Sequence, residues 1–188
     1  MGSIVDEYRD LFFSIMGRID RQDPLPVPWF AYNFWDKLQW SAYVGDCDGP
    51  RGLAFGINIE FTQTWKKIRP RLTEEALYSK LENLGNDEWH WHGRPGFLCK
   101  NPGIVDLYPR PFPRVSQVDI TKWLGDLDAI LDGQMTWAGG TRPMRPQLQI
   151  MRRVGNYDFA EDMNTVQDNV RTAMKDMGRL MAYLSGRG

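Results

Sequence analysis

The sequence predicts an α+β fold: a mostly antiparallel sheet with three to four helices, including a long C-terminal helix packed on the sheet. Segments with strand-like alternation come in groups instead of alternating regularly with helices, which disfavours a parallel, doubly wound sheet. One apolar stripe with a spacing of three or four residues continues from Phe159 to Leu184, which predicts a long helix. We expect residues 1–188 to form a single domain, because a chain of this length can bury a core without disulfides.

Two segments around a turn-rich loop predict an antiparallel hairpin. Apolar residues occupy every second position of 38–44 and again of 53–61, and the loop GDCDGPRG lies between them. Period-two alternation on both sides of a Gly/Asp/Pro loop is typical of paired strands with one buried face. The residues opposite the apolar faces are Gln39, Ser41, Tyr43, Ala54, Gly56, Asn58 and Glu60.

Capping residues and apolar spacing place the remaining elements. The first helix is expected to begin at Ser3 and to end at Gly17, and the last begins near Asp158 and Glu161, which have the spacing of a capping box. Three prolines in residues 23–30 force an extended path. The other predicted elements are helices over 73–85 and 118–131 and short strands over 88–92, 104–108 and 147–154.

Composition excludes several classes of protein. The net charge of -1 excludes a uniformly basic nucleic-acid coat, but it permits a local basic patch. No apolar run is long enough for a transmembrane helix, so we expect no membrane partner. Cys47 and Cys99 belong to no Cys-x-x-Cys motif, and we read them as reduced thiols of a cytoplasmic protein. Motifs for nucleotide, cofactor or nucleophilic sites are absent from the sequence, so no cofactor and no catalytic residue is expected.

Basic residues concentrate in three segments, 66–71, 94–114 and 137–153, which hold 12 of the 23 basic residues and one of the 24 acids. Five arginines in the chain precede a proline, which favours an extended backbone at each. Arginines beside aromatic rings suit phosphates and unstacked bases, and they suit acidic protein surfaces equally well. The candidate binding residues are Lys66, Lys67, Arg69, Arg94, Arg110, Arg142, Arg145, Trp65 and Trp137.

These segments predict a non-catalytic binding or regulatory module for nucleic acid or an acidic protein surface. The alternative is that they are solvated loops whose arginines pair with the acid-rich helices. The order of elements, a hairpin, short strands and a long closing helix, resembles accessory domains of bacterial restriction and phage-defence proteins. This resemblance lies in the arrangement and in no motif, and it implies a phage-defence context.

A second hypothesis rests on EWHWHGRPG, residues 88–96. If 88–92 is a strand, Trp89 and Trp91 share one face, and Glu88, His90 and His92 share the other. Two imidazoles side by side can hold a divalent metal, which would make the chain a small metal-assisted hydrolase. A further ligand such as Asp106 or Glu60 would have to lie nearby. The simpler interpretation is a polar strand face with both tryptophans in the core.

The last helix carries two surfaces of interest. The methionines of its apolar stripe, Met163, Met174, Met177 and Met181, predict core packing, or the seam of a homodimer. Its polar side carries a short basic row, Arg171, Lys175 and Arg179, which solvent alone can explain.

Overall fold

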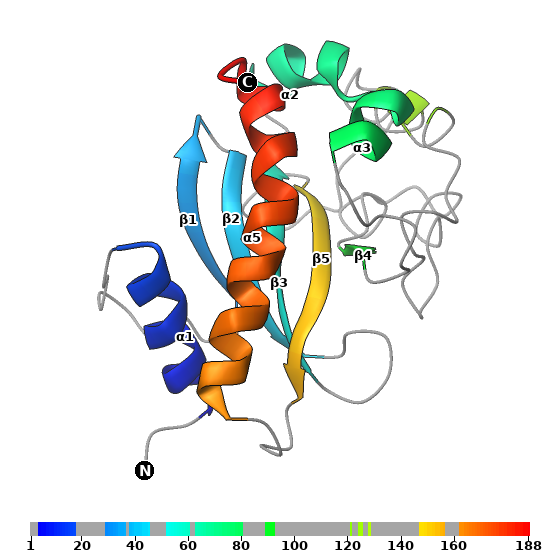
Figure 1. The fold of residues 1–188 in the computed structure, drawn as a ribbon. Helices are drawn as coiled ribbons and strands as arrows, with labels where there is room; N and C mark the ends of the chain where they lie inside the picture. Colours follow the sequence, from blue (N-terminus) through cyan, green and yellow to red (C-terminus); the bar gives the residue numbers. More distant parts are fainter. Residues whose placement is uncertain are drawn as a thin grey trace, which may run out of the picture.

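A computed structural model shows five strands in one sheet, with two helices lying across one of its faces (Figure 1). The structure describes residues 4–17, 29–36, 38–45, 52–60, 63–80, 89–92, 121, 124–125, 128, 147–156 and 162–188. The predicted α+β class, with its antiparallel sheet and long C-terminal helix, is confirmed. Within the described ranges, no helix is long and apolar enough to cross a membrane.

The sheet has the order β1-β2-β3-β5-β4, and every pairing of neighbours is antiparallel. The predicted hairpin forms, and the residues predicted to share one face of it do so. Ser41 pairs with Gly56, and Gln39 pairs with Asn58. The strands predicted near 88–92 and 147–154 are also present, whereas 104–108 lies outside the described residues. The strand bounds are Trp29–Trp35 for β1, Leu38–Gly45 for β2, Gly52–Glu60 for β3, Trp89–His92 for β4 and Gln147–Asn156 for β5.

Strand β1 was not predicted. Its register on β2 shifts between Asn33 and Trp35, so the side chains do not keep a simple period of two along WFAYNFW. Because aromatic residues occupy most positions of this segment, the sequence shows no period-two alternation there, and the edge strand could not be predicted.

Gly56 lets the two central strands approach closely. A Cβ added there would collide with the carbonyl oxygen of Ile150 and lie 2.8 Å from the Cα of Met151. Any larger residue would push β3 and β5 apart at the middle of the sheet.

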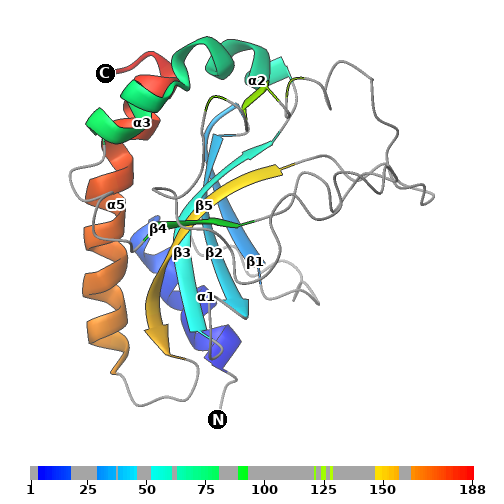
Figure 2. The same cartoon turned by 90° about the vertical axis from the view of Figure 1, so that its right-hand side faces the viewer.

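Helices α1 (Ile4–Ile15) and α5 (Met163–Ser185) cover the same face of the sheet (Figures 1 and 2). The predicted end of the first helix is confirmed: Gly17 has φ of +70°, a conformation that glycine adopts without strain. The buried Tyr8 hydroxyl donates to the carbonyl of Ala54 over 2.7 Å and ties α1 to β3.

The long helix begins later than predicted. Asp162 is its N-cap and accepts from the backbone N–H of Asn164 over 3.3 Å, whereas Asp158 lies outside the described residues. Asp162 precedes the helix directly, and this position allows its carboxylate to reach the first free N–H groups. Most of the predicted stripe is buried in the core, and Met163 and Met174 are half-buried against it.

A short helical layer closes the end of the sheet where α5 finishes (Figure 1). It consists of α2 (Gln63–Ile68), the 3-10 turn η1 (Arg69–Arg71) and α3 (Glu74–Lys80). The start of α3 was predicted correctly, and Thr73 Oγ1 accepts from the N–H of Ala76 over 3.1 Å. Helix α2 was not predicted, because its sequence QTWKKI shows basic residues but too few apolar positions to reveal a stripe. Residues 121, 124, 125 and 128 are helical, within the predicted range 118–131.

Candidate binding surfaces

Within the basic segment 66–71, the two lysines of α2 are exposed. The Lys67 ammonium donates to Asp36 Oδ2 over 3.1 Å and lies 5.6 Å from the centroid of the Trp35 ring. Exposed pairs of this kind contribute about 0–1 kcal/mol, so Lys67 can still exchange its partner. Trp65 belongs to α2, and only its backbone position is described. Lys66 and Lys67 therefore remain available to an anionic partner.

The arginines of the same segment hold the helical layer together. Arg69 Nε donates to Asp128 over 2.9 Å, and Arg71 Nη1 donates to the Leu184 carbonyl at the end of α5 over 3.1 Å. The last carbonyls of a helix have no partner inside the helix, so Arg71 satisfies one of them. This arrangement favours the alternative interpretation for Arg69, whose partner belongs to the acidic helical segment.

The remaining predicted binding residues, Arg94, Arg110, Arg142, Arg145 and Trp137, lie outside the described residues. The strand ends beside these segments are described, and they share one end of the sheet. Glu60 pairs with Gln147 and His92 pairs with Gln149, so β3 and β4 end where β5 begins. In sequence, Arg94 follows His92 by two residues and Arg145 precedes Gln147 by two.

The structure describes only part of the predicted metal site. Trp89 is 1% exposed and lies under Arg152, whose Cζ is 5.9 Å from the ring centroid, so this tryptophan faces the core as predicted. The side chains of His90 and His92, and all of Glu88, lie outside the described residues. Strand β5 separates β4 from β3, so Glu60 is not on the strand next to the histidines. Among described side chains, no group of three or more His, Cys, Asp or Glu residues can hold a metal.

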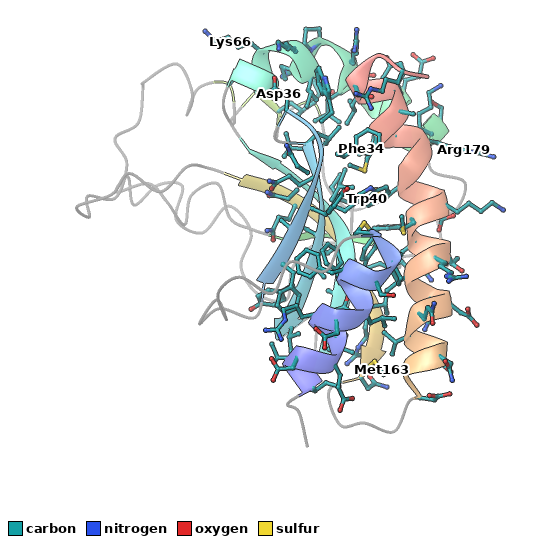
Figure 3. All side chains as sticks on the ribbon, turned by 90° about the vertical axis from the view of Figure 1, so that its left-hand side faces the viewer. Phe34, Asp36, Trp40, Lys66, Met163 and Arg179 are labelled. Carbon is teal, nitrogen blue, oxygen red and sulfur yellow. The ribbon has the colours of Figure 1, made fainter. Side chains whose placement is uncertain are left out.

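Exposed positive charges gather along α5. Arg171, Lys175 and Arg179 are exposed and follow one another at intervals of four residues, which places successive members on neighbouring turns. Tyr183 continues the series, and the Lys80 ammonium of α3 lies 5.0 Å from the centroid of its ring. Figure 3 shows Arg179 pointing away from the sheet. We call Arg171, Lys175, Arg179, Tyr183 and Lys80 the basic ridge.

Repulsion between the positive charges of the ridge lowers the stability of α5. Lys175 stands four residues from both Arg171 and Arg179, and a like-charge pair at this spacing destabilises a helix by about 0.2–0.5 kcal/mol. Within the described part of the chain, Arg171 and Lys175 form no ion pair that would offset this repulsion. The row is visible in the sequence, where solvation is a sufficient explanation for it, because spacing alone does not show exposure.

A row of polar residues crosses the other face of the sheet, away from α1 and α5. Each member pairs with the next across neighbouring strands. From β1 to β4 the row consists of Asn33, Gln39, Asn58, Gln149 and His92. The sequence pattern identified several of these as residues opposite the apolar face, but not that they form one row, because strand order and register are not local properties.

A buried ion pair connects α5 with the sheet on the helix-covered side. Arg152 Nη1 donates to Asp176 Oδ2 over 3.3 Å, and the two side chains are 13% and 5% exposed. Trp89 lies against the same guanidinium, as noted above. The contact anchors the middle of α5 over β5 and β4 and is structural rather than open to a partner.

In comparison with known proteins, no protein-family model, no curated protein and no solved structure matches the chain.

Proposed function

We propose that the protein is a non-catalytic nucleic-acid-binding module that holds the phosphate backbone on the basic ridge of α5. The observation that carries this proposal is the sign of the exposed charge. From Arg171 to the last residue, every charged side chain of α5 and its tail that is exposed is basic, and the one acid, Asp176, is buried against Arg152.

The helix dipole does not account for the row. Basic residues stabilise a helix mainly within its last turn, and the last turn of α5 contains none. Arg179 is six residues before Ser185, the final helical residue. The ridge therefore has no evident role in ending its own helix.

The geometry of the ridge favours phosphate contacts over base contacts. Arg179 lies eight positions after Arg171, and at 1.5 Å per residue the three basic side chains span about 12 Å along the helix axis. Duplex DNA carries one negative charge for about every 1.7 Å of its axis, so several phosphates face such a surface at once. Tyr183 is half-buried beneath Lys80, which leaves little of its ring for stacking. Binding by the ridge is therefore expected to depend on charge and not on base sequence.

The Arg-Pro segments extend this proposal to the end of the sheet that carries α2. Exposed Lys66 and Lys67 lie at this end, and the segments with Arg94 and Arg145 adjoin strands that end or begin there. We expect neutralising Arg142 and Arg145 together to weaken salt-dependent binding. Unchanged affinity in this double variant would remove Arg142 and Arg145 from the binding surface and leave the ridge.

The ridge is tested by the anisotropy of a fluorescent DNA duplex titrated with the protein. The variant Arg171→Gln/Lys175→Gln removes two charges, and glutamine has nearly the helix propensity of arginine and lysine. We expect affinity to fall about tenfold, since two contacts of up to 1 kcal/mol each are lost.

The matched control, Arg9→Gln/Arg153→Gln, also removes two positive charges but leaves the ridge unchanged. Arg9 lies on α1, where it pairs with Asp6 over 3.0 Å, and Arg153 lies on the sheet face away from α5. It should bind within about twofold of wild type, a difference of about 0.4 kcal/mol. Equal losses in both double variants would show that only net charge matters. Absence of binding to any duplex or single strand would shift the proposal to an acidic protein surface.

A further inference from the structure

We propose that the outer edge of β1 pairs with β1 of a second copy of this chain, so that two sheets join into one continuous antiparallel sheet. Strand β1 lies at the end of the sheet, and among the described residues it pairs only with β2. In Figure 3 this edge of the sheet faces the viewer. The inference goes beyond the function proposed above and does not depend on it.

Strand β1 lacks the charges that normally keep an edge strand from pairing. Its sequence, WFAYNFW, contains no charged residue and no proline, and five of its seven residues are aromatic. Edge strands of monomeric proteins commonly carry a lysine or a proline that prevents another strand from adding to them. The side chains of Tyr32, Phe34 and Trp35 are only half-buried within one chain. An uncharged aromatic edge therefore suits a partner strand of the same kind.

The sequence of β1 reads almost the same in both directions. Phenylalanine and then tryptophan follow at equal distances from Tyr32 on its two sides. If two copies pair antiparallel about Tyr32, Phe30 of one lies opposite Phe34 of the other, and Ala31 lies opposite Asn33. Dimers of identical chains most often have such a two-fold axis, which requires a surface that is complementary to itself. The near-palindromic strand meets this requirement.

This register also keeps each side chain on the correct face of the sheet. Opposed residues of an antiparallel pair point to the same face. Phe30 packs against α1, and the Phe34 ring meets the Trp40 ring edge-on with centroids 6.3 Å apart, so both lie on the helix-covered face. Ala31 and Asn33 both belong to the opposite face, where they pair with polar residues of β2.

A bulge sets the length of the paired segment. The register of β1 on β2 shifts between Asn33 and Trp35, and a bulge locally disrupts a ladder. Regular pairing therefore extends from Phe30 to Phe34 in each copy, with the axis at its middle. Aromatic pairs across strands stabilise an antiparallel sheet, and the axis makes the pair of phenylalanines form twice.

Charges outside the strand are complementary in this arrangement. Because the two strands run in opposite directions, the start of β1 in one copy lies beside the end of β1 in the other. Helix α1 packs near the start, and its Glu7 is exposed. Near the end, exposed Arg187 lies over the Phe34 ring at 5.7 Å from its centroid. Neither Glu7 nor Arg187 forms an ion pair among the described residues, so each can gain from the charge on the second copy.

The test is sedimentation equilibrium of the full chain from low-micromolar to high-micromolar concentration. We expect the measured mass to rise from one chain to two and then to stop, because a two-fold pairing uses both edges and is closed. A single-chain mass at every concentration would overturn the proposal, and so would a mass that keeps rising beyond two chains.

The decisive variant is Asn33→Lys, at an exposed position of β1. It places a like charge in each copy close to the axis, and we expect the dissociation constant of the dimer to rise about tenfold. The matched control Ser79→Lys adds the same charge at an exposed position of α3 and should dimerise as wild type does. An unchanged dissociation constant in Asn33→Lys would show that β1 is not the interface.

The register is tested by mixing two variants, Ala31→Glu and Asn33→Lys. Since Ala31 of one copy lies opposite Asn33 of the other, the introduced carboxylate and ammonium face each other only in the mixed dimer. We expect the mixed dimer to be about tenfold tighter than either variant alone. Its formation would also show that both variants fold. Equal affinities of mixed and unmixed dimers would contradict the register.

Dimerisation and DNA binding can fail separately. Arg171→Gln/Lys175→Gln should dimerise as wild type does, because both residues lie on α5, which packs over β3 and β5 at a distance from the β1 edge. A loss of dimerisation in this variant equal to that in Asn33→Lys would contradict the assignment to β1.

Discussion

At the scale of single residues, the ion pair Arg152–Asp176 joins the middle of α5 to the sheet. Its side chains are 13% and 5% exposed, and they join a helix to a strand 24 residues away in sequence. A buried charge loses its hydration on folding and needs its partner in return. The pair therefore makes the helix–sheet contact sensitive to loss of either side chain.

We expect Asp176→Asn to lower the free energy of unfolding by about 3–5 kcal/mol, because the guanidinium then loses this carboxylate. Urea denaturation followed by tryptophan fluorescence measures the change. Replacing both residues, as Arg152→Met/Asp176→Leu, should restore much of the loss, because no buried charge remains. An asparagine variant within 1 kcal/mol of wild type would contradict this account.

Residue pairs of this kind could not be found in the sequence. Asp176 lies within the apolar stripe of α5, and a lone acid at such a position reads as an irregularity until its partner is known. Trp89, in contrast, was assigned correctly to the core face, because strand alternation is a local property.

At the scale of elements, a glycine in the interior of α5 lowers the stability of the helix. Gly178 lies inside the helix, and a Cβ added there would meet nothing within 4 Å in the described structure. Glycine costs a helix interior about 1 kcal/mol relative to alanine. Gly178→Ala should therefore raise the melting temperature by about 2–4 °C in calorimetry.

At Gly186 we expect alanine to have the opposite effect on stability from alanine at Gly178. It caps α5 with φ of +74°, and a Cβ there would lie 2.7 Å from Arg71 Nη1. Gly186→Ala should lower the melting temperature, because it adds backbone strain and displaces the guanidinium. If both alanine variants shift stability in the same direction, the assignment of their roles is wrong.

Elements were predicted where local pattern determines them and missed where it does not. Period-two alternation identified β2 and β3, and a long apolar stripe identified α5. Strand β1 escaped because its bulge breaks the alternation, and α2 escaped because six residues are too few to show a helical period. The cap of α5 was predicted at Asp158, four residues before the actual cap Asp162, because Asp158 and Glu161 have the spacing of a capping box.

At the scale of the whole molecule, the sheet separates two surfaces of different chemistry. Arg179 of the basic ridge points away from the sheet (Figure 3), and the row of polar residues from Asn33 to His92 crosses the face of the sheet opposite α5. Sequence could identify the basic row and the polar strand positions separately. It could not show that the polar positions align across five strands, because that depends on strand order and register.

The central claim, that the ridge binds a phosphate backbone, is tested most directly by the salt dependence of duplex DNA binding. The logarithm of affinity should fall linearly with the logarithm of salt concentration, with a slope of about −0.9 for each phosphate contacted. Four ridge charges predict a slope of about −3 to −4, reduced in magnitude by about 2 in Arg171→Gln/Lys175→Gln. A slope that this variant leaves unchanged, or no binding at low salt, would contradict the claim.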